Sequence, residues 1–230
     1  MKKIIAVLLL AVFVFSLSGC SPQTYTIQSQ EATSRVATFT LNELLQNQSD
    51  AVIVGKVKNS TPVISIYENS NRKYEPSMLN EVEVVEVISG NLKKGDIVTV
   101  HELGDGSVFI YRSYEQFGGY LKTGDYVILF LNKSEDEHNY VVQGEKTYRE
   151  NHDTYVIEAA SEVKTLKTLY SVHPCQGRIW LTEDKQIDQE RNEGLLNWVG
   201  RKTEVIKPDE TYEEFVTRLK DVIADISAAE

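Results

Sequence analysis

The chain has 230 residues, of which 41% are hydrophobic and 25% charged, which suits one globular domain with an appended element rather than two full-sized domains. Thirteen glycines and five prolines exclude a collagen-like or low-complexity chain. Lys and Arg number 24 against 34 Asp and Glu, a net charge of −10. Because phosphate binding depends on basic side chains, this balance disfavours a nucleic-acid partner.

The first twenty residues have the pattern of an export signal. Lys2 and Lys3 precede an unbroken apolar run over residues 4–15, shorter than the roughly 20 residues of a membrane-spanning helix. An ordinary secretory signal is one interpretation. The sequence Leu17-Ser18-Gly19-Cys20 also resembles the lipobox of bacterial lipoprotein precursors. That resemblance implies a signal peptide over residues 1–19, and a thioether-linked diacylglyceryl group (as in palmitate-bearing lipoproteins) on Cys20. The protein would then be anchored to the extracytoplasmic face of the cell membrane.

Removal of the signal changes the charge and the cysteine count. Without Lys2 and Lys3 the chain keeps 22 basic and 34 acidic residues, a net charge of −12. We therefore expect the lipid, and no basic patch, to hold it at the membrane. A lipidated Cys20 leaves Cys175 alone, so no intramolecular disulfide is expected, and a small partly buried residue is its more usual role than a metal or redox site. Residues 20–38 are polar and predict a lipidated tether, part of which could pair with the body.

Residues 39–160 predict one short helix followed by strands. Thr40 and Glu43 form a capping box before a helix over 41–47, with Phe39 and Leu44 placed as a hydrophobic staple. Strands are expected over 51–58, 79–88, 97–101, 126–131, 140–143 and 155–157. A change of alternation at Val85 predicts a β-bulge. Two similar sequences, LKKGD at 92–96 and LKTGD at 121–125, predict the same tight turn with a positive φ.

Residues 161–230 predict a C-terminal extension. Val163, Leu166 and Leu169 have helical spacing, although threonines surround them. Thr211 and Glu214 form a second capping box before an amphipathic helix over 212–227, which we expect to dock on the body through its apolar face.

Together these elements predict a mainly β fold with flanking helices (α+β): a small, OB-like, partly open barrel with a short N-terminal helix and a docked C-terminal helix. Residues 50–143 resemble the OB-like barrel of uncharacterised envelope lipoproteins of low-GC Gram-positive bacteria. They are also distantly similar to the inhibitory barrel of metalloprotease inhibitors and netrins. Those inhibitors use a free N-terminal Cys held by disulfides, which this chain lacks, so the resemblance implies no inhibitory residues here.

The sequence carries no recognisable catalytic motif. Sequences of the G-x-S-x-G, H-E-x-x-H, P-loop, G-x-G-x-x-G and C-x-x-C types do not occur. His101, His138, His152 and His173 lack ligand spacing, so no metal, cofactor or catalytic residue is predicted. Residues 108–120 concentrate aromatics between glycines, as recognition surfaces do. Tyr114 and Phe117 are the candidate partner contacts, although aromatics of this segment could instead cover one end of the barrel.

We therefore expect a lipid-anchored, non-catalytic module that binds an unknown envelope protein or polymer, with the membrane as its other partner. An envelope-polymer hydrolase whose site has no linear motif is the first alternative. A structural subunit of a membrane complex is the second.

Overall fold

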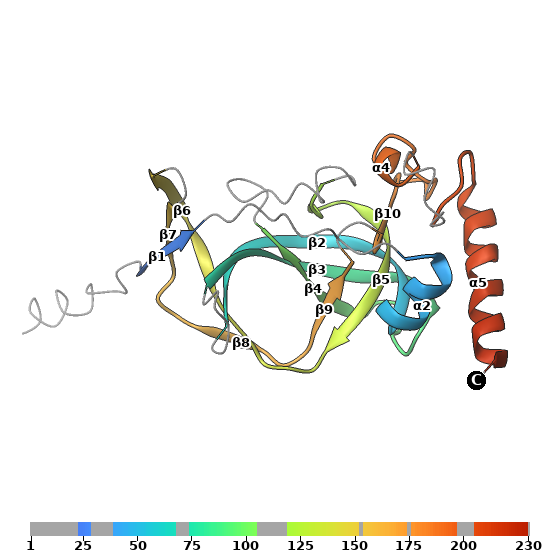
Figure 1. Cartoon of the computed structure of the whole chain (residues 1–230), viewed down its shortest axis with the longest axis horizontal. Coiled ribbons are helices and arrows are strands. Elements are labelled where there is room, and N and C mark those ends of the chain that lie inside the picture. The colour runs from blue at the N-terminus through green and yellow to red at the C-terminus, as the bar shows by residue number, and fades with distance from the viewer. Residues whose placement is uncertain are drawn as a thin grey trace, which may run out of the picture.

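A computed structural model describes residues 23–28, 39–67, 74–104, 119–151, 154–173, 176–196 and 205–229. Within them the chain is mainly β, with a few helices at one end of the molecule (Figure 1). The strands are β1 (Gln23–Gln28), β2 (Ala51–Ile66), β3 (Tyr74–Ser89), β4 (Ile97–Leu103), β5 (Tyr126–Ser134), β6 (His138–Asn151), β7 (Thr154–Ala159), β8 (Lys164–Leu166), β9 (Leu169–Val172) and β10 (Arg178–Leu181). The helices are α2 (Leu41–Gln48), α4 (Glu193–Leu196) and α5 (Tyr212–Ala229).

Five strands pair in a cycle, so that part of the sheet is ring-like. β2 pairs with β3, β3 with β4, β4 with β9, β9 with β5, and β5 returns to β2. Four of these pairings are antiparallel, and the β4–β9 pairing is parallel. β10 extends the sheet on the far side of β5.

The remaining strands form an extension at the end away from α5. The distal half of β2 pairs with β6, which in turn pairs with β7, and β1 pairs with β7 at the edge. β8 also pairs with β6. Figure 1 shows this extension on the left and α5 on the right, with the ring between them.

Side-chain alternation on the ring strands separates two cores. Ile53, Leu129 and Trp180 belong to a cluster with the buried valines of β3 and β4. The adjacent residues, which point to the opposite face of the same strands, form a second cluster with α2 and α5; they include Val54, Phe130 and Ile179. On α5 these contacts bury Phe215 and Leu219 completely, so the predicted docking of the C-terminal helix is confirmed.

Both helix starts have the predicted caps. Thr40 Oγ1 accepts from the backbone N–H of Glu43 at 3.2 Å, while a Glu43 carboxylate oxygen accepts from the backbone N–H of Thr40 at 2.8 Å. Thr211 and Glu214 repeat these two contacts at 3.2 and 2.9 Å. These hydrogen bonds lower the pKa of both glutamates and fix where α2 and α5 begin.

The predicted bulge and paired turns are also confirmed. In the register of β2 and β3, Gly55 lies opposite Val84 and Val54 opposite Glu86, so Val85 is the extra residue. Gly95 and Gly124 have φ values of 91° and 98°, which glycine adopts readily. In both turns the aspartate side chain accepts from the backbone N–H three residues earlier, at 2.8 Å.

Two predicted regions differ from the observed structure. β1 lies inside the expected tether, because Tyr25 and Ile27 bury their side chains against the extension. Beyond residue 160, helical spacing at Val163, Leu166 and Leu169 is not followed: β8 and β9 occur there instead. β9 and β10 pair with ring strands, so the ring continues past the predicted boundary.

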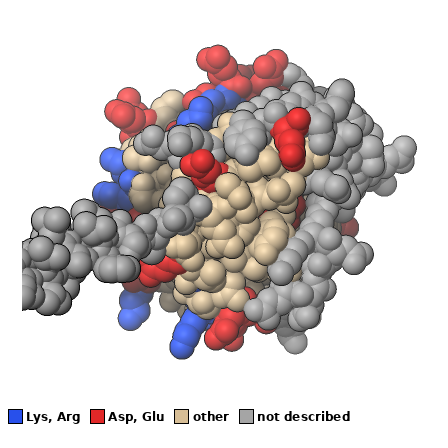
Figure 2. Space-filling view, turned by 90° about the vertical axis from the view of Figure 1, so that its left-hand side faces the viewer, with Lys and Arg blue, Asp and Glu red and all other residues tan. Residues whose placement is uncertain are grey.

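Charge is distributed unevenly over the end formed by β1, β7 and their neighbours. Viewed from the left-hand side of Figure 1, the visible middle of this end is largely uncharged, and most Lys, Arg, Asp and Glu side chains lie towards its edge (Figure 2). β1 itself, with the sequence QTYTIQ, has no charged residue.

Candidate functional site

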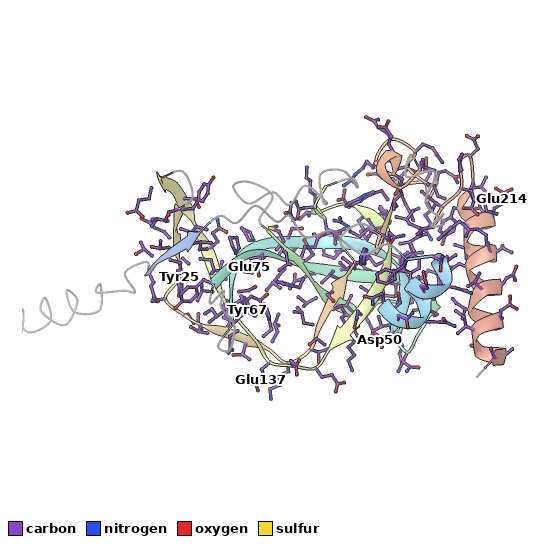
Figure 3. The ribbon with its side chains drawn as sticks, in the orientation of Figure 1. Tyr25, Asp50, Tyr67, Glu75, Glu137 and Glu214 are labelled. Carbon is purple, nitrogen blue, oxygen red and sulfur yellow. The ribbon has the colours of Figure 1, made fainter. Side chains whose placement is uncertain are left out.

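A cluster of polar side chains is buried where the ring meets the extension. Ser65 comes from β2, Ser77 from β3, His101 from β4 and His138 from β6. Ser65 and Ser77 are fully buried, and His138 is 9% exposed. Tyr67, directly after β2, and Glu75, the second residue of β3, lie beside this cluster in the left half of the molecule (Figure 3). We call Ser65, Ser77, His101 and His138 the serine–histidine cluster.

Ser65 is the centre of this cluster. Its hydroxyl oxygen lies 3.3 Å from His101 Nε2, 3.1 Å from His138 Nε2 and 3.0 Å from Ser77 Oγ. The Ser77 hydroxyl is 3.3 Å from the backbone carbonyl of Glu75, which can only accept. If the Ser77 hydroxyl donates there and that of Ser65 donates to Ser77, the Ser65 lone pairs face the two imidazoles. Both Nε2 atoms then carry a hydrogen, an assignment that follows from the network.

The surroundings of the cluster favour the neutral form of every titratable member. Burial, together with the neighbouring His138 imidazole, lowers the pKa of His101 to about 3. Burial also lowers the pKa of His138. Burial raises the pKa of Tyr67 to about 12, with the Glu75 carboxylate adding to the effect and a hydrogen bond with Ser65 opposing it. The two imidazole rings are 4.9 Å apart, so a proton on one disfavours a proton on the other.

The chemistry that this cluster can perform follows from those protonation states. A serine–histidine pair acts as nucleophile and base when the hydroxyl donates to the imidazole. With the Ser65 hydroxyl donating to Ser77 and each imidazole donating to Ser65, neither histidine would accept the serine proton. Whichever atoms carry the hydrogens, these contacts form a hydrogen-bonded bridge that links β2, β3, β4 and β6. Within the described residues, no group of three or more His, Cys, Asp or Glu side chains could hold a metal ion.

A buried ion pair lies inside the ring. Arg178 of β10 donates to a Glu102 carboxylate oxygen at 2.5 Å, and both side chains are almost fully buried. The other Glu102 oxygen accepts from Asn80 Nδ2 and from the backbone N–H of Leu121, each at 3.0 Å. Arg178 also donates to the Gly119 carbonyl at 2.6 Å. These contacts fix the chain where it re-enters the described structure at Gly119.

The three site residues predicted from the sequence, Cys20, Tyr114 and Phe117, lie outside the described residues, as does Cys175. Of the aromatic segment, only Gly119 and Tyr120 are described, and Tyr120 is 8% exposed, so it belongs to the covered interior.

The serine–histidine cluster was not foreseen from the sequence. Ser65 is 36 residues from His101 and 73 from His138, so no short sequence motif indicates that these side chains are in contact. The one available signal is a serine within the otherwise apolar run VISI at 63–66.

Comparison with protein-family models, curated proteins and solved structures finds no significant match to this chain. Among the residues that the structure describes, no helix is both long enough and apolar enough to cross a membrane.

Proposed function

We propose that this protein is an extracytoplasmic lipoprotein, anchored to the cell membrane through lipid on Cys20, and that its body is a non-catalytic binding module of the cell envelope. The observation that carries the proposal is Leu17-Ser18-Gly19-Cys20, directly after a short apolar run with two lysines before it. Two acyl chains hold a protein far more firmly than one, and each buried CH₂ contributes about 0.8 kcal/mol. A lipidated Cys20 would therefore anchor the acidic chain without a basic patch.

The strand pairings support an OB-like description of the body. β2, β3, β4, β5 and β9 occur in this order along the chain, with β6, β7 and β8 between β5 and β9, and they pair in the cycle β2–β3–β4–β9–β5–β2. A five-stranded cycle with one parallel pair, between its third and fifth strands, is the arrangement of OB-like barrels. Barrels of this kind host many functions, so the fold alone does not decide between a binding role and an enzymatic one.

Tyr114 and Phe117 remain the proposed partner contacts. The described residues on either side of their segment are firmly held: the backbone N–H of Gly104 donates to the Pro76 carbonyl at 2.8 Å, and the Gly119 carbonyl accepts from Arg178. A recognition segment with both ends attached to the ring is supported by a rigid base, as binding sites on scaffolds usually are.

An envelope-polymer hydrolase is the second candidate, and one distance favours it. Ser65 Oγ is 3.1 Å from His138 Nε2, which is within the range of a nucleophile and its base. Burial opposes it, because Ser65 has no exposed surface with which to meet a polymer. A hydrolase would react with a fluorophosphonate probe at Ser65 and lose that labelling in Ser65→Ala; the binding proposal expects no labelling of either protein.

Membrane fractionation of the protein in cells tests the anchor. Wild type should sediment with membranes and be released by detergent, whereas Cys20→Ala should lose this association. Equal membrane association of the two proteins would contradict the proposal.

Crosslinking in cells tests the binding role. Tyr114→Ala/Phe117→Ala should melt within a few degrees of wild type and lose its crosslinked neighbours. A large fall in melting temperature would instead place these aromatics in the core, and unchanged neighbours would place the contact elsewhere.

A further inference from the structure

The position of β1 limits where the body can lie relative to a lipid on Cys20. Only Ser21 and Pro22 separate Cys20 from Gln23, the first residue of β1. Consecutive Cα atoms are 3.8 Å apart, so Gln23 lies within about 11 Å of the Cys20 Cα, however the two residues are arranged. The start of β1 therefore cannot move far from the lipid headgroups.

β1 is an integral part of the body. All six of its residues pair with β7, from Gln23 opposite Ala159 to Gln28 opposite Thr154. Tyr25 and Ile27 are each 5% exposed and pack with Ile64, Val141 and Ile157 of three other strands. The Tyr25 ring also meets the Tyr74 ring edge-on, with centroids 5.0 Å apart. A restraint on β1 is therefore a restraint on the whole extension.

The surface beside this attachment point suits a membrane. The mature chain has a net charge of −12, which repels an anionic membrane surface. β1 nevertheless has no charged residue, and its outward side chains are the exposed Thr24 and Thr26. Among the described residues, charged side chains lie mostly around the edge of this end (Figure 2), and Glu158 of β7, opposite Thr24, is the charged residue in the β1–β7 pairing. Threonine and glutamine side chains can hydrogen-bond phospholipid headgroups without charge repulsion.

We propose that the end formed by β1 and β7 rests on the phospholipid headgroups, and that the long axis of the body points away from the membrane with α5 at its far end. This inference depends on the proposed lipid at Cys20. In the view of Figure 1, the membrane would lie to the left of β1, and the ring would separate it from α5. With only two residues between Cys20 and β1, the attachment sets the orientation of the body, and a partner would meet the ring and α5 away from the bilayer.

Fluorescence quenching on the lipidated protein tests this orientation. In a Cys175→Ser background, Thr24→Cys on β1 and Asp225→Cys on α5 each provide one exposed thiol for a fluorophore. Thr24 is at most about 15 Å along the chain from Cys20 by the same spacing. In vesicles with a headgroup-attached nitroxide, the Thr24→Cys probe should be strongly quenched and the Asp225→Cys probe should fluoresce as in vesicles without nitroxide.

Insertion of 20 Gly and Ser residues after Pro22 is the matched control. Such a linker has a root-mean-square length of about 25 Å, so it should release the body and reduce quenching at Thr24→Cys. Unchanged quenching after the insertion would overturn the claim that the short segment sets the orientation.

Two results separate failure of this inference from failure of the anchor. Equal quenching of both probes in protein that carries its lipid, as shown by intact mass, would overturn the orientation and leave the anchor standing. Protein without lipid that does not float with vesicles would overturn both.

Discussion

Acid should weaken this fold through His101. Burial and the adjacent His138 lower the pKa of His101 to about 3 in the folded protein, whereas an unfolded histidine has its ordinary pKa of about 6.5. The folded state therefore binds fewer protons than the unfolded state between these values. The stability that depends on neutral His101 is present above pH 6.5 and is lost as the pH falls below it.

The size of the effect follows from the same two values. At pH 5 the folded histidine is still neutral, while nearly every unfolded chain has taken up the proton. One unit of pKa corresponds to 1.36 kcal/mol, so going from pH 7 to pH 5 should remove about 2 kcal/mol through His101 alone. For a chain of this size, that corresponds to a fall of about 4–8 °C in melting temperature.

Urea denaturation of the detergent-solubilised protein at pH 7, 6 and 5 measures this slope. The variant His101→Gln keeps an N–H that can donate to Ser65 but has no titrating group. It should lose about 2 kcal/mol less than wild type between pH 7 and pH 5, whatever its absolute stability. His138→Gln should also flatten the slope, because burial lowers the pKa of His138 as well. Parallel pH curves for wild type and His101→Gln would refute this reasoning.

Three further experiments test the packing. Leu219→Asp puts a charge on a fully buried position of α5 and should lower the free energy of unfolding by at least about 4 kcal/mol, whereas Asp221→Ala at an exposed position should change it by less than about 0.5 kcal/mol. Equal melting temperatures for the two variants would mean that α5 is not docked. Arg178→Met should lower the free energy of unfolding by about 3–5 kcal/mol, because it leaves the buried Glu102 carboxylate without its cation. Adding Glu102→Leu to this variant should restore part of that stability, and an unchanged denaturant midpoint would contradict the pairing. Gly55→Ala should cost about 1–3 kcal/mol, since a Cβ there would collide with the Val82 side chain of β3. A wild-type melting temperature would show that the two strands can separate at this point.

Local signals in the sequence predicted local structure well. The Thr40–Glu43 and Thr211–Glu214 capping boxes place the starts of α2 and α5, because those side chains satisfy backbone groups within one turn. The slip at Val85 marks a bulge because alternation is interrupted wherever an extra residue enters a strand.

Structure that depends on distant partners was harder to predict. Tyr25 and Ile27 are isolated apolar residues in a polar segment. This segment becomes a strand because it pairs with β7, about 130 residues later in the chain. The short strands β9 and β10 likewise gain their stability from pairing with β4 and β5. A propensity argument cannot foresee either case, because tertiary contacts decide the conformation of short segments.

The candidate site lay beyond reach of the sequence for the same reason. His101 and Ser65 meet because β4 and β2 each pair with β3, and His138 joins them through β6. The histidines share no motif, and their proximity depends on the register of four strands. The lipobox-like sequence can be recognised without a structure, because its four residues are consecutive and do not have to be brought together by the fold.

Peptide mass spectrometry of the mature N-terminus tests the central claim most directly. The protein is extracted from membranes with detergent, digested, and its N-terminal peptide is sequenced by mass spectrometry. The account predicts a chain that begins at Cys20 and carries the mass of a diacylglyceryl group on that residue. An unmodified N-terminus, or a mature chain that begins at any other residue, would contradict it.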